Sequence, residues 1–86
     1  MPEISRFFGI VIRMYYDDHG APHFHASYSG QEVKIAIQPI RIVEGKLSKR
    51  ALSLVLEWAA LHQQELLDAW ESARAEQPLN KIDPLE

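Results

Sequence analysis

The hydrophobic pattern of this chain changes its period once, near residue 45, and this change limits the possible fold more than any other feature. Between residues 4 and 44, apolar side chains recur mostly at every second position, which is the spacing of β-strands. From Ser48 to about residue 76, apolar residues recur at helical spacing until Pro78. The sequence therefore predicts an α+β domain in which a three- or four-stranded antiparallel β-meander packs on one long C-terminal helix.

Three strands are predicted in the first half of the chain, followed by a short fourth strand or edge extension. Gly9 lies inside the first alternating run, which is read as one strand, and indicates a bulge or a close approach of the backbone to another group. Ser29-Gly30 separates two later runs, and a two-residue turn there would place Phe24 opposite Ile35. The predicted bounds are 4–16 for the first strand, 23–28 and 31–37 for the next two, and 40–44 for the fourth element.

The 86 residues are predicted to form a single domain, 1–86, because the chain is too short to build a second hydrophobic core. The sheet is expected over about 4–44, the helix over about 48–76 and an extended tail over 77–86. A ridge of three apolar residues lies on a different side of the helix from the stripe that would face the sheet. Either the sheet wraps around this ridge, or another chain covers it as a homodimer partner or a small cognate partner protein. The ridge consists of Leu54, Trp58 and Leu61.

Polar side chains are expected to gather on the sheet face that points away from the helix. Placing Met14 opposite Ala26 and Ile12 opposite Tyr28 brings the apolar sides of the first two strands together. The other face then collects side chains that can bind ligands, transfer protons or carry charge. This predicted polar face consists of Arg13, Tyr15, Asp17, His23, His25, Ser27, Glu32 and Lys34.

Three of the four histidines lie between residues 19 and 25. His23 and His25 are one residue apart, so a strand presents both imidazoles on the same side, where they can bind one cation. Asp17 or His19 would complete the set of ligands. Because the chain has no cysteine, histidine and carboxylate are its only strong metal ligands, and these suit a divalent transition metal such as Zn, Ni, Mn or Fe.

The same side chains also allow chemistry without a metal. His23 or His25 can act as a general acid or base, with Tyr15 beside them. Arg13 or Lys34 can stabilise the charge that develops on a phosphoryl group during RNA cleavage. In a third interpretation the histidines have no chemical role and only stabilise the loop. The sequence does not distinguish an enzyme from a non-enzymatic protein.

Composition excludes several classes of protein. A net charge of −3 argues against tight, non-specific coating of nucleic acid, which needs positive charge. The absence of cysteine excludes disulfides and thiolate nucleophiles, and it fits a reducing cytoplasm. No apolar run approaches about 18 residues and no signal-peptide pattern opens the chain, so a cytoplasmic protein without a membrane span is expected.

Several segments together resemble a bacterial protein family. The segments are Ile4 to Ile12, Asp18-His19 with Pro22 to Ala26, Glu44 to Leu47, and Leu56 to Ala59. They are similar to the family called domain of unknown function 4160, and the resemblance covers nearly the whole chain. The family has no established activity to transfer. Similar proteins are small and are often encoded beside another small family, in an arrangement that looks like a toxin–antitoxin pair.

The resemblance implies a small bacterial protein that is the toxin-like component of such a pair and is directed at RNA. His23 and His25 would form the reactive centre, and the ridge on the helix would bind the partner. Arg13, Tyr15 and Lys34 would support the histidines. A metal-binding module and a protein–protein interaction domain without enzymatic activity are the two alternatives, and family likeness alone does not choose between them.

Overall fold

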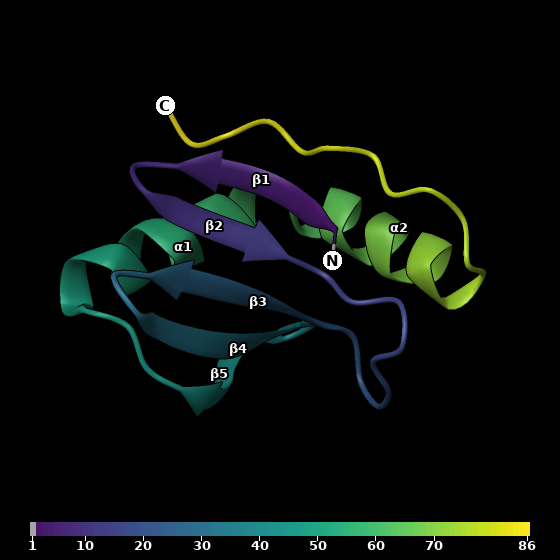
Figure 1. Ribbon diagram of the computed structural model, residues 1–86, viewed down its shortest axis with the longest axis horizontal. Coiled ribbons are helices and arrows are strands. Elements are labelled where there is room, and N and C mark those ends of the chain that lie inside the picture. The colour runs from purple at the N-terminus through teal and green to yellow at the C-terminus, as the bar shows by residue number, and fades with distance from the viewer. Residues whose placement is uncertain (1) are drawn as a thin grey trace.

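The computed structural model describes residues 2–86, which form a five-stranded antiparallel sheet and two helices packed against one of its faces (Figure 1). Strands that follow one another in the chain are also neighbours in the sheet. The predicted α+β class and the strand after residue 39 are confirmed, but the predicted number of strands and the single helix are wrong. The elements are β1 Glu3–Phe7, β2 Ile10–Arg13, β3 His23–Tyr28, β4 Gln31–Ile37, β5 Ile40–Gly45, α1 Lys49–Leu61 and α2 Gln63–Arg74.

The first predicted strand is two strands, because the chain reverses at Phe8 and Gly9. Both residues have positive φ, 51° for Phe8 and 80° for Gly9, and this combination closes a two-residue hairpin turn. A side chain at Gly9 would also approach the Tyr28 ring, since an added Cβ would lie 3.4 Å from it. β1 therefore lies at the edge of the sheet and pairs with β2.

The register of the sheet agrees with the prediction for one pair of strands and differs for another. β3 and β4 pair as predicted, with Phe24 opposite Ile35. Between β2 and β3 the predicted register is wrong by two residues, because Ala26 lies opposite Ile12 and not Met14. A shift of two residues keeps every side chain on its predicted face, so periodicity cannot detect it.

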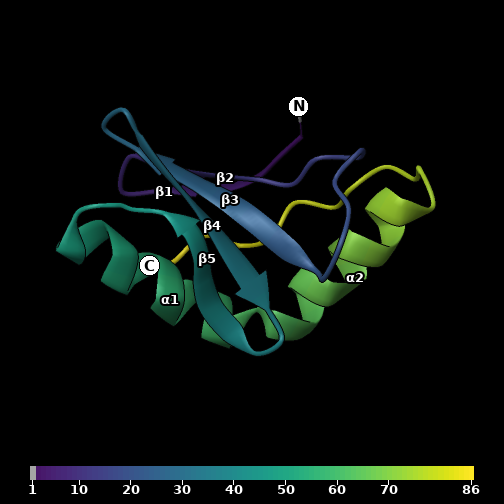
Figure 2. The same ribbon diagram turned by 90° about the horizontal axis from the view of Figure 1, so that it is seen from below.

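The predicted long helix is interrupted at His62, where α1 ends and α2 begins at a different angle beneath the sheet (Figure 2). His62 has φ −121° and ψ 26°, outside helical values. Gln63 donates its side-chain amide to the Ile37 carbonyl at 2.7 Å and so ties the break to the end of β4. The break lets each helix follow its own part of a twisted sheet. Neither helix in residues 2–86 is long and apolar enough to cross a membrane.

The core lies between the sheet and the two helices. Trp58 is fully buried in it, and its ring centroid lies 5.4 Å from that of Phe7. The tail runs beside β1 (Figure 1), where the Ile82 amide donates to the Ile4 carbonyl at 2.8 Å. Trp58 Nε1 also donates to the tail, at the Asp83 carbonyl, over 2.8 Å. The tail therefore closes part of the outer edge of the sheet and joins the core.

Candidate metal centre

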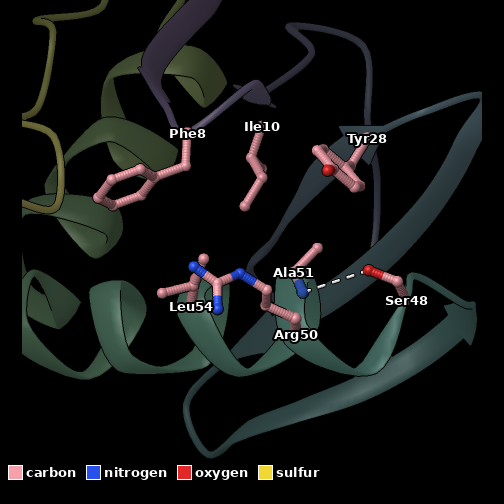
Figure 3. Close-up of a pocket in the computed structure, with 7 residues that line it drawn as sticks. All are labelled: Phe8, Ile10, Tyr28, Ser48, Arg50, Ala51 and Leu54. Carbon is pink, nitrogen blue, oxygen red and sulfur yellow. Dashed lines mark hydrogen bonds between the residues drawn. The ribbon is translucent and has the colours of Figure 1, made fainter.

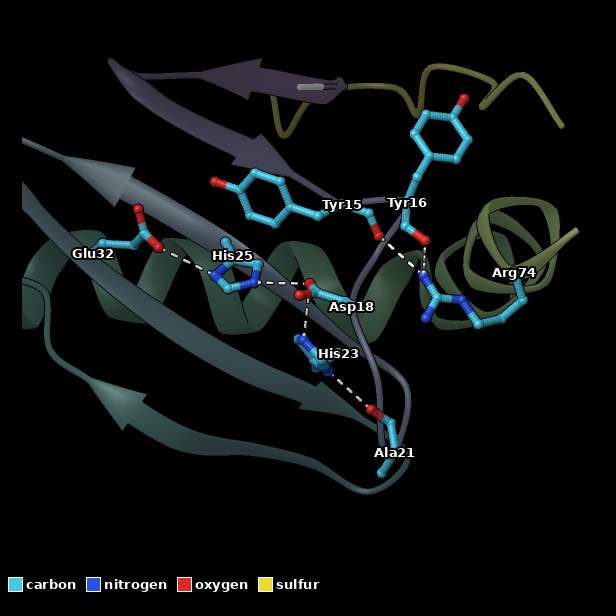
Figure 4. Close-up of polar contacts among 8 residues, drawn as sticks. All are labelled: Tyr15, Tyr16, Asp18, Ala21, His23, His25, Glu32 and Arg74. Atoms are coloured by element: carbon cyan, nitrogen blue, oxygen red, sulfur yellow. Dashed lines mark hydrogen bonds and ion pairs between the residues drawn. The ribbon is translucent and has the colours of Figure 1, made fainter. Parts of the chain in front are cut away.

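The loop between β2 and β3 folds back over the start of β3 and places Asp18 against two imidazoles (Figure 4). Asp18 Oδ2 lies 3.0 Å from His23 Nε2 and 3.1 Å from His25 Nε2. One ligand atom from each of the three residues lies within 4.8 Å of the other two. The two imidazoles therefore converge, as their spacing on a strand predicts, and the third member of the cluster is Asp18.

The cluster is partly shielded from water. The side chain of His23 is 5% exposed, that of His25 is 15% exposed and that of Asp18 is 24% exposed. His23 packs against Trp70 of α2, with ring centroids 4.9 Å apart. Access to the cluster therefore runs past His25 and Asp18, and a hollow of about 230 Å³ adjoins His25 on the side of β4 and β5.

Arg74 of α2 holds the loop that carries Asp18. Its Nη2 donates to the carbonyls of Tyr15 at 3.1 Å and Tyr16 at 2.8 Å (Figure 4). The guanidinium also lies over the Trp70 ring, 4.3 Å from its centroid, in a cation–π contact. The helix thus positions both the loop and His23, although nothing in the sequence pattern singles out Arg74 as part of the site.

The ring nitrogens of the two histidines make more contacts with oxygen atoms than two neutral imidazoles have N–H groups to donate. His23 Nδ1 lies 2.9 Å from the Ala21 carbonyl oxygen. His25 Nδ1 lies 3.1 Å from Glu32 Oε2, so all four ring nitrogens face oxygen atoms. Two neutral imidazoles carry one N–H each and satisfy only two of these four contacts. Two additional protons, or one divalent cation between Asp18 and the two Nε2 atoms, would supply the missing charge.

Two of the three distances between possible ligand atoms fit the coordination geometry of a transition metal. Ligands held at about 2.0–2.2 Å from one metal lie roughly 3–3.5 Å apart, and the two contacts of Asp18 are 3.0 and 3.1 Å long. A hydrogen bond from Nδ1 to a carbonyl or carboxylate is what orients a histidine that binds metal through Nε2. Two histidines with one carboxylate are also the ligand set of non-haem iron sites with open positions.

Cationic residues flank His25 on both sides in the sheet. Arg13 of β2 and Lys34 of β4 are its direct cross-strand partners. Arg13 Nη1 donates to Ser27 Oγ at 3.0 Å, which holds the guanidinium along the sheet face. These positive charges lie close enough to act on any anion that reaches His25, and they oppose a cation there unless carboxylates balance them.

Tyr15 covers one side of His25, with the two ring centroids 4.6 Å apart. Burial raises the pKa of the Tyr15 hydroxyl, and the negative charges of Glu32 and Asp18 raise it further. Arg13 lowers this pKa in part. The hydroxyl therefore stays protonated at neutral pH.

Comparison with known proteins places the chain in a family. The family model described as domain of unknown function (DUF4160) matches residues 9–71. The chain belongs to the DUF4160 family. No curated protein and no solved structure matches it. The segment matched by the DUF4160 model contains Asp18, His23 and His25, whereas β1 and the tail lie outside it.

Two of the metal ligands predicted for this DUF4160 protein lie outside the cluster. Asp17 and His19 are exposed and border a separate shallow hollow together with Arg74. Asp18, which takes their place, was noted in the sequence only as part of the Asp18-His19 segment that resembles the family. Strand periodicity does not extend into the loop, so the sequence pattern could not decide which of two adjacent aspartates turns toward the histidines.

The three residues of the predicted partner ridge do not form one surface. Trp58 is fully buried, so the prediction that it contacts a partner is corrected. Its ring packs against Phe7 of β1 and its Nε1 donates to the tail, so the sheet and the tail cover Trp58, which is the other alternative that the sequence left open. Leu61 is 67% exposed, and Leu54 is half-buried at the edge of a small pocket near the start of α1 (Figure 3).

Proposed function

We propose that this DUF4160 protein is a metal-binding domain in which Asp18, His23 and His25 hold one divalent transition metal. The observation that carries the proposal is the convergence of two Nε2 atoms on one carboxylate oxygen, at 3.0 and 3.1 Å. In the tautomer in which each Nδ1–H donates to its oxygen neighbour, both Nε2 lone pairs point at Asp18 Oδ2. A metal ion between these atoms would accept both lone pairs and the carboxylate.

The ligand set also indicates the class of metal and the kind of site. Imidazole with carboxylate suits Zn, Fe, Ni, Mn or Co, whereas Ca and Mg favour oxygen ligands alone. Three protein ligands leave at least one coordination position for water or a substrate, as in catalytic zinc sites. The hollow beside His25 is also lined by Glu32 and Lys34, and it leaves room for a small ligand next to one of the three proposed metal ligands. These features support a site that binds an exchangeable ligand.

Calorimetric titration of tag-free protein with Zn²⁺, together with the visible spectrum of the Co²⁺ form, tests the proposal. We expect a single bound ion per chain. Removing one ligand, with Asp18→Asn or His25→Ala, should weaken binding by more than the roughly 10- to 100-fold that loss of an orienting neighbour causes. Asp17→Asn and His19→Ala are the matched controls and should keep the affinity of the wild type.

Circular dichroism of each variant establishes that the fold persists, since Asp18 and His25 are only partly buried. The proposal fails if folded wild-type protein binds none of these metals at micromolar concentration. It also fails if the control substitutions weaken binding as much as the ligand substitutions do.

A second candidate function is supported by the position of His25 between Arg13 and Lys34 in the sheet. In this function the protein is the toxin-like component of a toxin–antitoxin-like pair and cleaves RNA in the cytoplasm without a metal. His25 would transfer the proton, and the two cations would stabilise the charge on the phosphoryl oxygens. This candidate follows the resemblance of the chain to proteins encoded in such pairs.

Expression in a bacterial host tests this candidate. Wild-type protein should arrest growth, and His25→Ala or Lys34→Met should relieve the arrest, whereas Lys46→Met on the exposed surface should not. RNA cleavage by purified protein should persist in a chelator. If neither arrest nor cleavage occurs, the candidate is removed. Cleavage that stops with chelator and returns with Zn²⁺ or Mn²⁺ would assign the activity to the metal centre.

A further inference from the structure

A small pocket lies at the end of β3 opposite to the metal centre, between the β1–β2 turn and the start of α1 (Figure 3). Phe8 and Tyr28 border it from the sheet, and Arg50 and Leu54 border it from α1. Its volume is about 40 Å³, and one water molecule needs roughly 10–15 Å³ by the same measure. The pocket therefore has room for one aliphatic side chain.

Phe8, at the rim of this pocket, is strained and exposed. Its φ of 51° lies in the left-handed region, which bulky side chains rarely adopt and which Asn or Gly accepts at this turn position. The side chain is also 59% exposed, and its edge-on contact with Phe7 has a centroid distance of 6.4 Å. An aromatic residue that neither suits its turn nor fills the core points to a function outside folding.

Positive charge at the start of α1 is a second and independent feature of this region. Lys49 and Arg50 begin the helix, Lys46 precedes them, and the first turn has no acidic residue. Cations are unfavourable at a helix N-terminus because the helix dipole is positive there. All three side chains are exposed, although the chain as a whole has a net charge of −3.

We infer that this pocket and its basic rim are the docking site for an acidic segment of a partner protein. The segment inserts one aliphatic side chain between Phe8 and Leu54, and its carboxylates face Arg50 and Lys49. Charge complementarity between the two chains sets the orientation and speeds association. The proposed docking site includes Leu54 of the predicted partner ridge and excludes Trp58. It is independent of the metal function, because Tyr28 ends β3 whereas His23 begins it.

A protein segment fits this site better than RNA does. The pocket accepts an object of aliphatic size, and Ile10 and Leu54 give it an apolar lining. The polar groups of Tyr28, Ser48 and Arg50 border it and can donate to the carboxylates of an acidic segment. Single-stranded RNA instead needs a broad basic groove with aromatic platforms for successive bases. Phe8 and Tyr28 border one small pocket and not such a groove.

The test is an NMR titration of the full-length protein with a short synthetic peptide made of Glu, Leu and Ala. Amide signals of Phe8, Gly9 and Leu54 should shift, and added salt should weaken the binding. A peptide with Lys in place of Glu, and another with Ala in place of Leu, should each bind about tenfold more weakly or worse. Phe8→Asn and Arg50→Glu should weaken binding of the acidic peptide to a similar extent.

These two substitutions separate docking from a structural role. Asn accepts the positive φ of the turn, and Glu matches the helix dipole, so both variants should melt at or above the temperature of the wild type while they bind less. Arg41→Glu on β5 is the control for charge alone and should leave the affinity unchanged. Unshifted amide signals, equal binding of the Lys-containing peptide, or full affinity in both variants would each overturn the inference. Binding of oligouridine at these amides in place of the acidic peptide would overturn it in favour of RNA.

Discussion

Asp18 sets the chemistry of the histidine pair, because its Oδ2 is shared by the two Nε2 atoms. Histidines that alternate on a strand ordinarily find separate partners or face water. Here the backbone carbonyl of Ala21 and the carboxylate of Glu32 engage both Nδ1 atoms, so the two remaining nitrogens have only Asp18 to contact. A single loop residue thus brings the two histidines into one cluster that has the ligand types of a metal site.

At the level of single residues, Gly45 tests how closely the backbones of β4 and β5 pack. Its φ is +82°, and an added Cβ would lie 2.3 Å from the Glu32 carbonyl oxygen. Gly30 has a similar φ of +81° but nothing within 4 Å of an added Cβ, so it is a matched control. Gly30→Ala should lower the free energy of unfolding by about 1–2 kcal/mol, because alanine is strained in left-handed backbone. Gly45→Ala should lower it by about 1–3 kcal/mol more, because the Glu32 carbonyl must move to make room for the new Cβ.

Urea denaturation of both variants measures the difference. Equal losses for Gly30→Ala and Gly45→Ala would show that the ladder between β4 and β5 is free to shift at this point. The comparison is informative because the two glycines share the same backbone requirement and differ only in their neighbours.

At the scale of secondary structure, the prediction succeeded where a local signal decides the outcome. Ser29-Gly30 lies between two alternating runs of matched length, and the turn and the register of β3 and β4 follow from it. Phe8 and Gly9 form the same kind of turn, but Phe is a poor residue for it and the apolar alternation continues on both sides. The hairpin was therefore mistaken for one strand with a bulge.

The interruption at His62 has no local signal of this kind. The residues around it favour helix, and neither Gly nor Pro stands there. The break depends instead on the twist of the sheet and on the hydrogen bond from Gln63 to the end of β4. For the same reason, the sequence did not predict the second helix. It also did not predict that Arg74 of this helix holds the Asp18 loop.

At the scale of the whole molecule, the tail is part of the core. Ile82 and Leu85 are buried, with exposed fractions of 5% and 9%, and the Asp83 carbonyl accepts the hydrogen bond of Trp58 Nε1. The segment matched by the family model ends before these residues. The matched segment alone therefore lacks contacts that the folded protein uses.

Truncation after Pro78 should destabilise the protein severely. The two buried side chains contribute about 1.5–3 kcal/mol each, which is a large share of the 5–15 kcal/mol typical of a whole domain. Thermal and urea denaturation measure the loss. If the truncated chain does not fold, Ile82→Ala is the alternative test and should lower the free energy of unfolding by about 2–5 kcal/mol. Pro84→Ala, on the exposed part of the tail, is its control and should change the free energy of unfolding little. A truncated chain as stable as the wild type would show that the tail only rests on the surface.

The sequence by itself determined the class of the fold, the faces of the strands and the pairing of His23 with His25, because alternation and helical spacing act over a few residues. Only the tertiary structure decided the strand register, the interruption of the helix, the burial of Trp58 and the choice of Asp18 over Asp17. Each of these depends on groups that are distant in the chain, and their contacts form only when loop, sheet and helix pack together. The two histidines of the candidate site therefore follow from local sequence pattern, whereas Asp18 joins them only through tertiary packing.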